Sequence, residues 1–226
     1  MRRVERRGQT SGIVRGGPTG TAAYIGVFGL VALFGTGCGG GPRPPAPGFG
    51  MLAGRTVLVL PVQGVRPSAG GWVGGARNGR EAAREADAEI AFALRERGGR
   101  ATWIVAEEQR DMLRRRPGIE VDPYALATDA MVEEGSKIKR IRDPLYGEVR
   151  AIAALFDTRY AVWPMEVLYQ PAEGEGAGRV GIRTLFLDAR TGDVLWQGMV
   201  YGTPEIVSSA AALASAAQAF ADQVSP

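Results

Sequence analysis

The chain carries few side chains that could perform catalysis or bind a metal. It has no histidine and a single cysteine, Cys38. The lack of histidine excludes Ser-His-Asp and Cys-His triads and histidine-based zinc sites, because these need an imidazole as base or ligand. One cysteine also excludes an internal disulfide. We therefore expect no catalytic residue, no metal ligand and no bound cofactor.

Pairs of carboxylates remain as candidates, since two acids suffice to cleave a glycosidic bond. Each pair also has a structural explanation, because acidic residues favour helix starts, solvated helix ends and turns. A carboxylate-based hydrolase is therefore the less favoured alternative to a protein without catalysis. The available pairs are Glu107 with Glu108, Glu133 with Glu134, and Asp188 with Asp193.

Cys38 stands directly after a segment that resembles an export signal in its order of charge and hydropathy. Five arginines and one glutamate lie within residues 1–37, and residues 22–34 form an uncharged apolar run that precedes Gly35-Thr36-Gly37. A basic start, a short apolar stretch and small residues before the cleavage point are typical of a signal peptide. Thirteen apolar residues fall short of the roughly 20 that span a bilayer. The sequence therefore predicts export.

A cysteine at the cleavage point, followed by Gly39-Gly40-Gly41-Pro42, resembles a bacterial lipoprotein signal. The resemblance implies that residues 1–37 are removed and that the Cys38 thiol is diacylated and anchors the protein in a membrane. Gly39 after the cysteine implies sorting to the outer membrane, by analogy with the Gram-negative rule. Gly35 stands where such signals carry an aliphatic residue, so an uncleaved anchor and a secretory signal with a free cysteine stay open.

The charge of the chain lies in its first residues. Residues 1–37 have a net charge of +4, whereas residues 38–226 hold 22 basic and 23 acidic residues. The exported part is therefore not basic, and we expect no nucleic acid partner. Residues 38–54 are rich in glycine and proline and read as a tether between the lipid and the folded domain.

Residues 55–226 predict a single α/β domain, a layered sandwich of a mixed sheet and helices. Apolar β-prone runs alternate with segments in which apolar residues recur every three or four positions. The chain ends with a β-hairpin followed by an Ala-rich helix, for which Thr203 is the expected N-cap. We expect strands over 56–60, 101–105, 160–169, 179–188 and 193–200, and helices over 80–97, 107–116, 123–134, 144–156 and 206–224.

Three segments are candidates for recognition, each with a structural alternative. Trp72 lies in the glycine-rich loop 64–79, where it is either a partner or ligand anchor or a residue tucked onto the sheet edge. Arg114, Arg115 and Arg116 form a basic patch or complement the negative end of a helix dipole. The basic segment 137–142 reads as a solvated linker, or as an exposed edge strand that faces a partner.

Two motifs resemble those of a group of bacterial envelope domains. The sequence Thr56-Val57-Leu58-Val59-Leu60-Pro61-Val62 is similar to their first strand, V-x-V-L-P-F, and residues 187–196 resemble their hairpin, D-x-x-T-G-x-V-L-W. Tyr160-Ala161-Val162-Trp163 matches a strand that these domains also carry. The group includes the curli-secretion lipoprotein, the lipoprotein activators of penicillin-binding proteins and the amino-terminal domain of the Tol-system propeller protein. The resemblance implies fold and compartment rather than an activity.

These observations together predict a membrane-anchored envelope lipoprotein without chemistry of its own. We expect it to act as an accessory or assembly factor that faces the periplasm and binds another envelope protein or assembles with itself. A small-ligand-binding envelope protein, with its site near Trp72, is the first alternative. A hydrolase of an envelope polymer, built on the carboxylate pairs, is the second.

Overall fold

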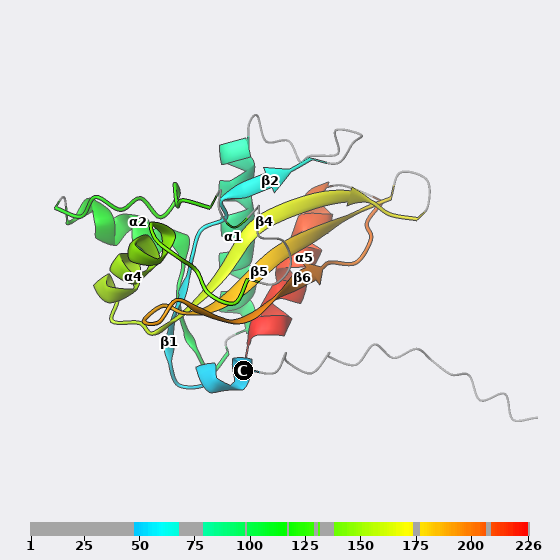
Figure 1. Cartoon of the computed structure of the whole chain (residues 1–226). Coiled ribbons are helices and arrows are strands. Elements are labelled where there is room, and N and C mark those ends of the chain that lie inside the picture. Colours follow the sequence, from blue (N-terminus) through cyan, green and yellow to red (C-terminus); the bar gives the residue numbers. More distant parts are fainter. Residues whose placement is uncertain are drawn as a thin grey trace, which may run out of the picture. The chain divides into compact units, whose positions relative to one another are not determined.

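The computed structural model describes residues 48–67, 79–97, 99–116, 118–128, 131, 138–173, 177–206 and 209–225. A six-stranded sheet forms the centre of this part of the chain, with β3, β1, β4, β5 and β6 in that order and β2 paired to the outer part of β4 (Figure 1). The strands are β1 (Thr56–Val59), β2 (Gly64–Arg66), β3 (Thr102–Ile104), β4 (Tyr160–Pro171), β5 (Gly178–Asp188) and β6 (Asp193–Tyr201).

The strand directions divide the sheet into two parts. β1 pairs in parallel with β3 and β4, and β2 also runs parallel to β4. β4, β5 and β6 form an antiparallel meander, in which the turn at Gly192 has the positive φ of 79° that glycine adopts without strain. A mixed sheet flanked by helices confirms the predicted α/β fold class.

Two apolar cores lie on the two faces of the sheet. On one face, α1 (Gly79–Arg97), α5 (Ser209–Val224) and the short helix η1 (Phe49–Leu52) contribute the buried side chains. The opposite face packs against α4 (Leu145–Leu155) around Trp163, which is fully buried and donates its indole N–H to the Pro61 carbonyl at 3.1 Å. Figure 1 shows α1 and α5 together on one side of the sheet. Helix α2 (Ala106–Arg114) follows β3 closely in the chain.

The packed domain begins earlier than Arg55. Phe49 and Leu52 are fully buried, and the Phe49 ring stacks on Phe186 at 5.0 Å and meets the edge of Trp196 at 5.4 Å. The end of the predicted tether is therefore part of the core. The glycine-proline composition of residues 38–54 concealed this, because two apolar side chains make no periodic pattern.

The C-terminal helix begins later than Thr203-Pro204 predicts. The Thr203 hydroxyl lies 2.7 Å from the Ser215 hydroxyl in the middle of α5, so it does not cap the helix start. The backbone of Glu205 exchanges two hydrogen bonds with Gly178, at 2.8 and 2.9 Å. These long-range bonds hold Glu205 in an extended conformation, and the prediction of a helix from Ile206 is wrong for this reason.

The predicted helix over 123–134 is wrong for residues 123–128. Asp122 accepts a hydrogen bond from the Tyr124 N–H at 2.9 Å, which forms an Asx turn instead of a helix cap. The Gln63 side chain then holds this segment through the Pro123 carbonyl and the Leu126 N–H. Such bonds from a distant residue are invisible to local sequence patterns.

The described part of the basic segment before α4 has a paired backbone, while the side chains of Lys139, Arg140 and Arg142 are exposed. The Ile141 N–H donates to the Gly192 carbonyl and the Val194 N–H to the Lys139 carbonyl, so the segment adds a short bridge beside β6. Ile138 and Ile141 are buried in the core around Trp163. The edge-strand interpretation therefore describes this segment better than the linker.

Gly202 allows α5 to approach the end of β6. A Cβ at this position would lie 2.5 Å from the Ala216 backbone nitrogen, and helix backbone cannot yield as a side chain can. We expect Gly202→Ala to lower the free energy of unfolding by about 1–3 kcal/mol, the usual cost of overpacking. Urea denaturation measures this loss. Gly50→Ala is the control, since a Cβ there meets no atom within 4 Å, and equal losses in both variants would contradict the close approach.

Candidate functional site

The candidate residues of the sequence analysis lie in different places. Cys38, Trp72 and the pair Glu133-Glu134 lie outside the described residues. Arg114, Arg115 and Arg116 are exposed at the C-terminal end of α2, and Arg114 forms an ion pair with Asp111 one turn earlier. This placement fits the helix-dipole interpretation of the three arginines, and a partner contact there stays a prediction.

The Glu107-Glu108 pair is divided between two environments. The Glu108 carboxylate accepts the Val105 N–H at 3.3 Å, as a residue in the first turn of a helix does, and lies 3.6 Å from the guanidinium of Arg95. Glu107 instead faces a pocket between α1 and α2. The two carboxylates therefore do not act as a pair on one substrate position.

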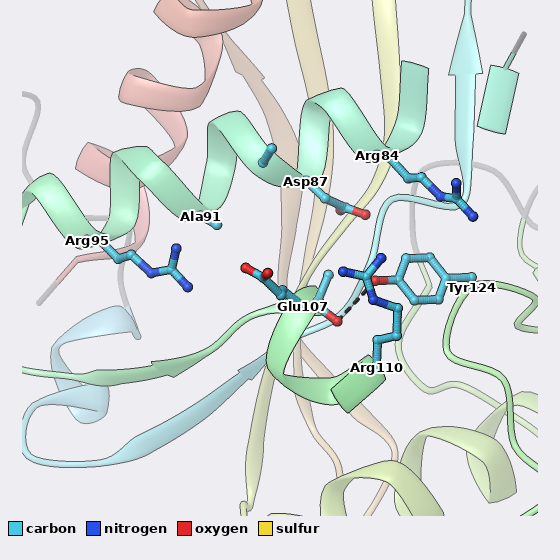
Figure 2. Close-up of a pocket in the computed structure, with 9 residues that line it drawn as sticks. Arg84, Asp87, Ala91, Arg95, Glu107, Arg110 and Tyr124 are labelled. Atoms are coloured by element: carbon cyan, nitrogen blue, oxygen red, sulfur yellow. Dashed lines mark hydrogen bonds between the residues drawn. The ribbon is translucent and has the colours of Figure 1, made fainter. Parts of the chain in front are cut away.

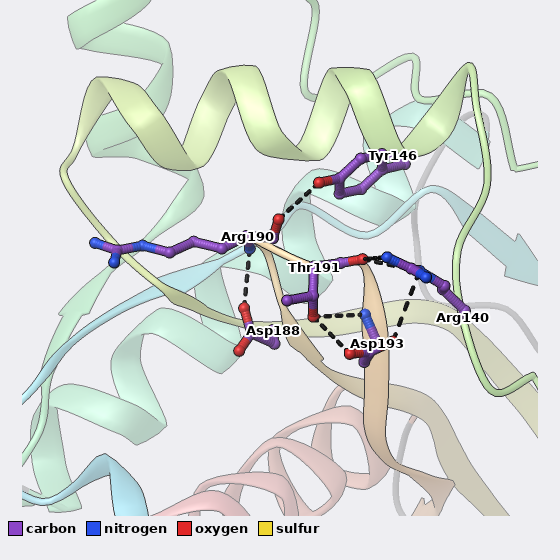
Figure 3. A network of polar contacts seen from close by, with 6 residues as sticks. All are labelled: Arg140, Tyr146, Asp188, Arg190, Thr191 and Asp193. Carbon is purple, nitrogen blue, oxygen red and sulfur yellow. Dashed lines mark hydrogen bonds and ion pairs between the residues drawn. The ribbon is translucent and has the colours of Figure 1, made fainter.

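Asp188 and Asp193 both belong to the turn that joins β5 and β6 (Figure 3). Asp188 accepts the Arg190 N–H at 3.0 Å and pairs with the Arg159 guanidinium at 2.8 Å. Asp193 accepts the Thr191 hydroxyl at 2.7 Å. Each carboxylate is thus engaged in holding the turn, which favours the structural explanation over general acid or base catalysis.

Tyr146 and Arg140 attach this turn to the rest of the domain. The Tyr146 hydroxyl donates to the Arg190 carbonyl at 2.6 Å, and the Arg140 guanidinium donates to the Thr191 carbonyl from the other side (Figure 3). The turn is therefore fixed to α4 and to the segment before it. In the residues that the structure describes, no group of three metal-ligating side chains occurs and no helix is long and apolar enough to cross a membrane.

On the face of Trp163, the sheet continues past the core around α4, and we call this region the open face. It lies on the outer halves of β4, β5 and β6, beyond the core around α4, and no described helix contributes to it. A register shift between Pro164 and Glu166 turns the side chains of the outer β4 residues, so that Glu166 and Leu168 point to this face. Arg66 of β2 pairs with Leu168 and belongs to the same surface. The open face therefore consists of Arg66, Glu166, Leu168, Arg179, Gly181, Arg183, Met199 and Tyr201. Arg66 and Tyr201 are exposed, Glu166 and Gly181 are buried, and the other members are half-buried.

An aromatic ring and three guanidinium groups dominate the open face. The Arg179 guanidinium lies 4.6 Å from the centre of the Tyr201 ring, and a Cβ on Gly181 would lie 2.7 Å from that ring, so the ring rests on the glycine. Tyr201 remains 41% exposed. Glu166 pairs with both Arg66 and Arg183, which leaves a net positive charge on this surface. The alternation Arg179-x-Gly181-x-Arg183 in β5 is visible in the sequence, and it could have indicated that these three residues share one face of the sheet.

A pocket of about 260 Å³ lies between α1, α2 and Tyr124 (Figure 2). Asp87 projects into it from α1, with one carboxyl oxygen accepting the Val62 N–H at 2.9 Å. Its second oxygen is buried and has no hydrogen-bond partner in the described part of the chain. Burial raises the pKa of Asp87 to about 7, against the opposing effect of the Val62 hydrogen bond. Sequence analysis missed this site, because Asp87 lies in an ordinary helical pattern.

No protein-family model and no curated protein matches the chain. Solved structures do resemble it. The LpoB C-terminal domain from Salmonella enterica is 17% identical over 66% of this chain and 83% of its own, with a TM-score of 0.36. The PelC dodecamer from Paraburkholderia phytofirmans is 13% identical over 77% and 89%, with a TM-score of 0.38. Lipoprotein GNA1162 from Neisseria meningitidis is 15% identical over 66% and 78%, with a TM-score of 0.31. These matches include members of the group that the sequence motifs resemble, at low identity.

Proposed function

We propose that this protein is an envelope lipoprotein that binds another envelope protein through the open face and performs no chemistry of its own. The lipid on Cys38 holds it in the outer membrane, and the domain faces the periplasm. Residues 39–48 serve as the tether between the lipid and the core, which begins at Phe49. The observation that supports binding most strongly is the open face itself.

The composition of the open face is that of a protein-binding surface. Tyrosine and arginine dominate the binding energy of interfaces, and here Tyr201 and Arg179 are already held against each other. A side chain that is ordered before binding loses less entropy when the partner arrives. Three arginines against one glutamate favour an acidic partner segment, since complementary charge guides association and excludes other partners.

Three of the carboxylates that the sequence offered as pairs favour this proposal over a hydrolase. Asp188 and Asp193 are occupied by hydrogen bonds of the turn, and Glu108 by the start of α2. A glycosidase needs two carboxylates that face one another across a substrate. The open face offers only Glu166, which is paired with two arginines.

The proposal predicts that Arg179→Glu abolishes capture of the partner. The test is in-cell cross-linking and affinity purification from the native envelope, followed by a binding titration with the purified partner. We expect the dissociation constant to rise at least about 30-fold, the effect of losing a central interface residue worth about 2 kcal/mol. Tyr201→Ala is expected to act in the same direction without altering charge.

Arg190→Glu is the matched control, because it makes the same charge change on an exposed side chain of the turn before β6. Its binding is expected to equal that of the wild type. Reversing the charge of the cross-linked acidic residue on the partner should restore binding to Arg179→Glu. Undiminished binding by Arg179→Glu, or cross-links only to a second copy of this chain, would overturn the proposed contact.

A further inference from the structure

The pocket between α1 and α2 lies where α/β folds commonly bind small ligands, outside the carboxyl ends of parallel strands. Val62 follows the end of β1 and bonds to Asp87, and Ala106 and Glu107 follow the end of β3. Ala91 and Ala106 line the space and leave it empty because their side chains are small. The site is separate from the open face, which lies on the outer halves of β4, β5 and β6.

Positive charge prevails around this pocket. Arg84 and Arg95 on α1 and Arg110 on α2 line it, against Glu107 and Asp87. Arg95 has a carboxylate neighbour in Glu108, whereas neither Arg84 nor Arg110 has an ion-pair partner among the described residues. The first turn of α2 also borders the pocket, and the positive end of its dipole favours an anion.

The polar groups of the pocket also define the shape of its ligand. Figure 2 shows Asp87 facing Arg110 and Tyr124 across the gap between the helices, with Arg84 and Arg95 on either side along α1. The Tyr124 hydroxyl is already used, since it donates to the Ala106 carbonyl at 3.0 Å. Hydrogen-bond donors on several sides of the pocket suit a tetrahedral anion with more than two oxygens. A guanidinium group can donate to two oxygens of such an anion at once.

We propose that this pocket binds a phosphate group, held by the guanidinium groups of Arg84 and Arg110 with the carboxyl of Asp87 as a hydrogen-bond donor. The second oxygen of Asp87, which lacks a partner, carries the proton in the bound state. The phosphate belongs either to a small soluble compound or to a lipid headgroup, because the same chemistry recognises both. This site does not depend on the open face or on the proposed partner.

The proposal implies that binding weakens as the pH rises. Asp87 must be protonated to donate, and its pKa of about 7 means that it ionises between pH 6 and pH 8. An ionised Asp87 repels the anion. The other charged or titratable groups of the pocket are Arg84 and Arg95 on α1, Glu107 and Arg110 on α2, and Tyr124, whose own pKa is raised to about 12 by burial and by Asp87.

The test is equilibrium binding of inorganic phosphate to the full chain. Arg84→Ala/Arg110→Ala is expected to raise the dissociation constant at least tenfold. The matched control is Arg100→Ala/Arg142→Ala, which removes the same charge from exposed positions that do not line the pocket and should stay within twofold of the wild type. Flotation with phosphatidylglycerol and phosphatidylcholine vesicles distinguishes a lipid headgroup from a soluble phosphate. For this assay the same two variants also carry Cys38→Ser, so that the lipid anchor does not contribute.

Sulfate serves as the probe of pH dependence, since its charge is constant over this range. The wild type should bind sulfate several-fold more tightly at pH 6 than at pH 8. Asp87→Asn keeps a donor and the Val62 contact but cannot ionise, so its affinity should be the same at both values. Pocket-dependent binding of phosphate or of phosphatidylglycerol vesicles supports the proposal. Equal binding by the pocket and control variants, in both assays, would overturn it.

Discussion

Replacing Cys38 with serine is expected to release the protein from the membrane. The serine hydroxyl cannot form the thioether through which a lipoprotein cysteine carries its diacylglyceryl group. Two acyl chains hold a protein stably in a membrane, because each buried CH₂ contributes about 0.8 kcal/mol to the binding free energy. Without the lipid, the apolar run of residues 22–34 is the remaining candidate anchor, and it is too short to span the bilayer. We expect nearly all wild-type protein to sediment with membranes and most Cys38→Ser protein to lose this anchoring.

Membrane fractionation and mass spectrometry of the N-terminal peptide together measure this effect. Acyl mass should occur on Cys38 in the wild type and be absent from the serine of Cys38→Ser. Gly39→Ala is the control, since it alters the neighbour without removing the thiol. A wild-type protein that is soluble and has no acyl mass on Cys38 would refute the anchor and favour an ordinary secretory signal.

Phe49→Ala is expected to be among the most destabilising single substitutions in the domain. The ring is fully buried between Phe186 and Trp196. Truncating a buried phenylalanine leaves a cavity and removes apolar contacts, at a cost of about 3–5 kcal/mol. A domain of this size has a total stability of about 5–15 kcal/mol, so the variant loses a large share. Its urea midpoint should fall accordingly.

Met51→Ala in the same short helix is the matched control, because its side chain is 46% exposed. We expect its stability to change by less than about 0.5 kcal/mol, as surface substitutions usually do. If Phe49→Ala unfolded at the same urea concentration as Met51→Ala, the short helix would not be part of the core, and residues 38–54 would all belong to the tether as the composition suggested.

The strands and the hairpin could be predicted because their signals are local. Val57, Leu58 and Val59 form a continuous apolar run, as expected for a strand covered on both faces, and β1 has neighbours on both sides. Gly192 marked the turn between β5 and β6 because only a residue that tolerates positive φ fits there. The Ala-rich pattern of residues 206–224 likewise predicted a helix that packs closely on the sheet, and α5 forms over Ser209–Val224.

Elements held by distant partners could not be predicted. Glu205 is extended because its backbone bonds to Gly178, and residues 123–126 turn because Gln63 holds them. In each case the local pattern favoured a helix, and a contact across more than 20 residues of sequence decided otherwise. Phe49 was assigned to the tether for the same reason, since its partners Phe186 and Trp196 lie at the other end of the chain.

The sequence by itself determined which side chains are available for chemistry and which kind of signal the first residues resemble. Composition is independent of folding, so the absence of histidine, the single cysteine and the order of residues before Cys38 hold in any conformation. Tertiary structure alone decided where the proposed binding surfaces lie. Arg84, Asp87 and Arg110 come together only because α1 and α2 pack beside each other, and the open face exists only because a register shift at Met165 turns the outer half of β4 beyond the cover of α4.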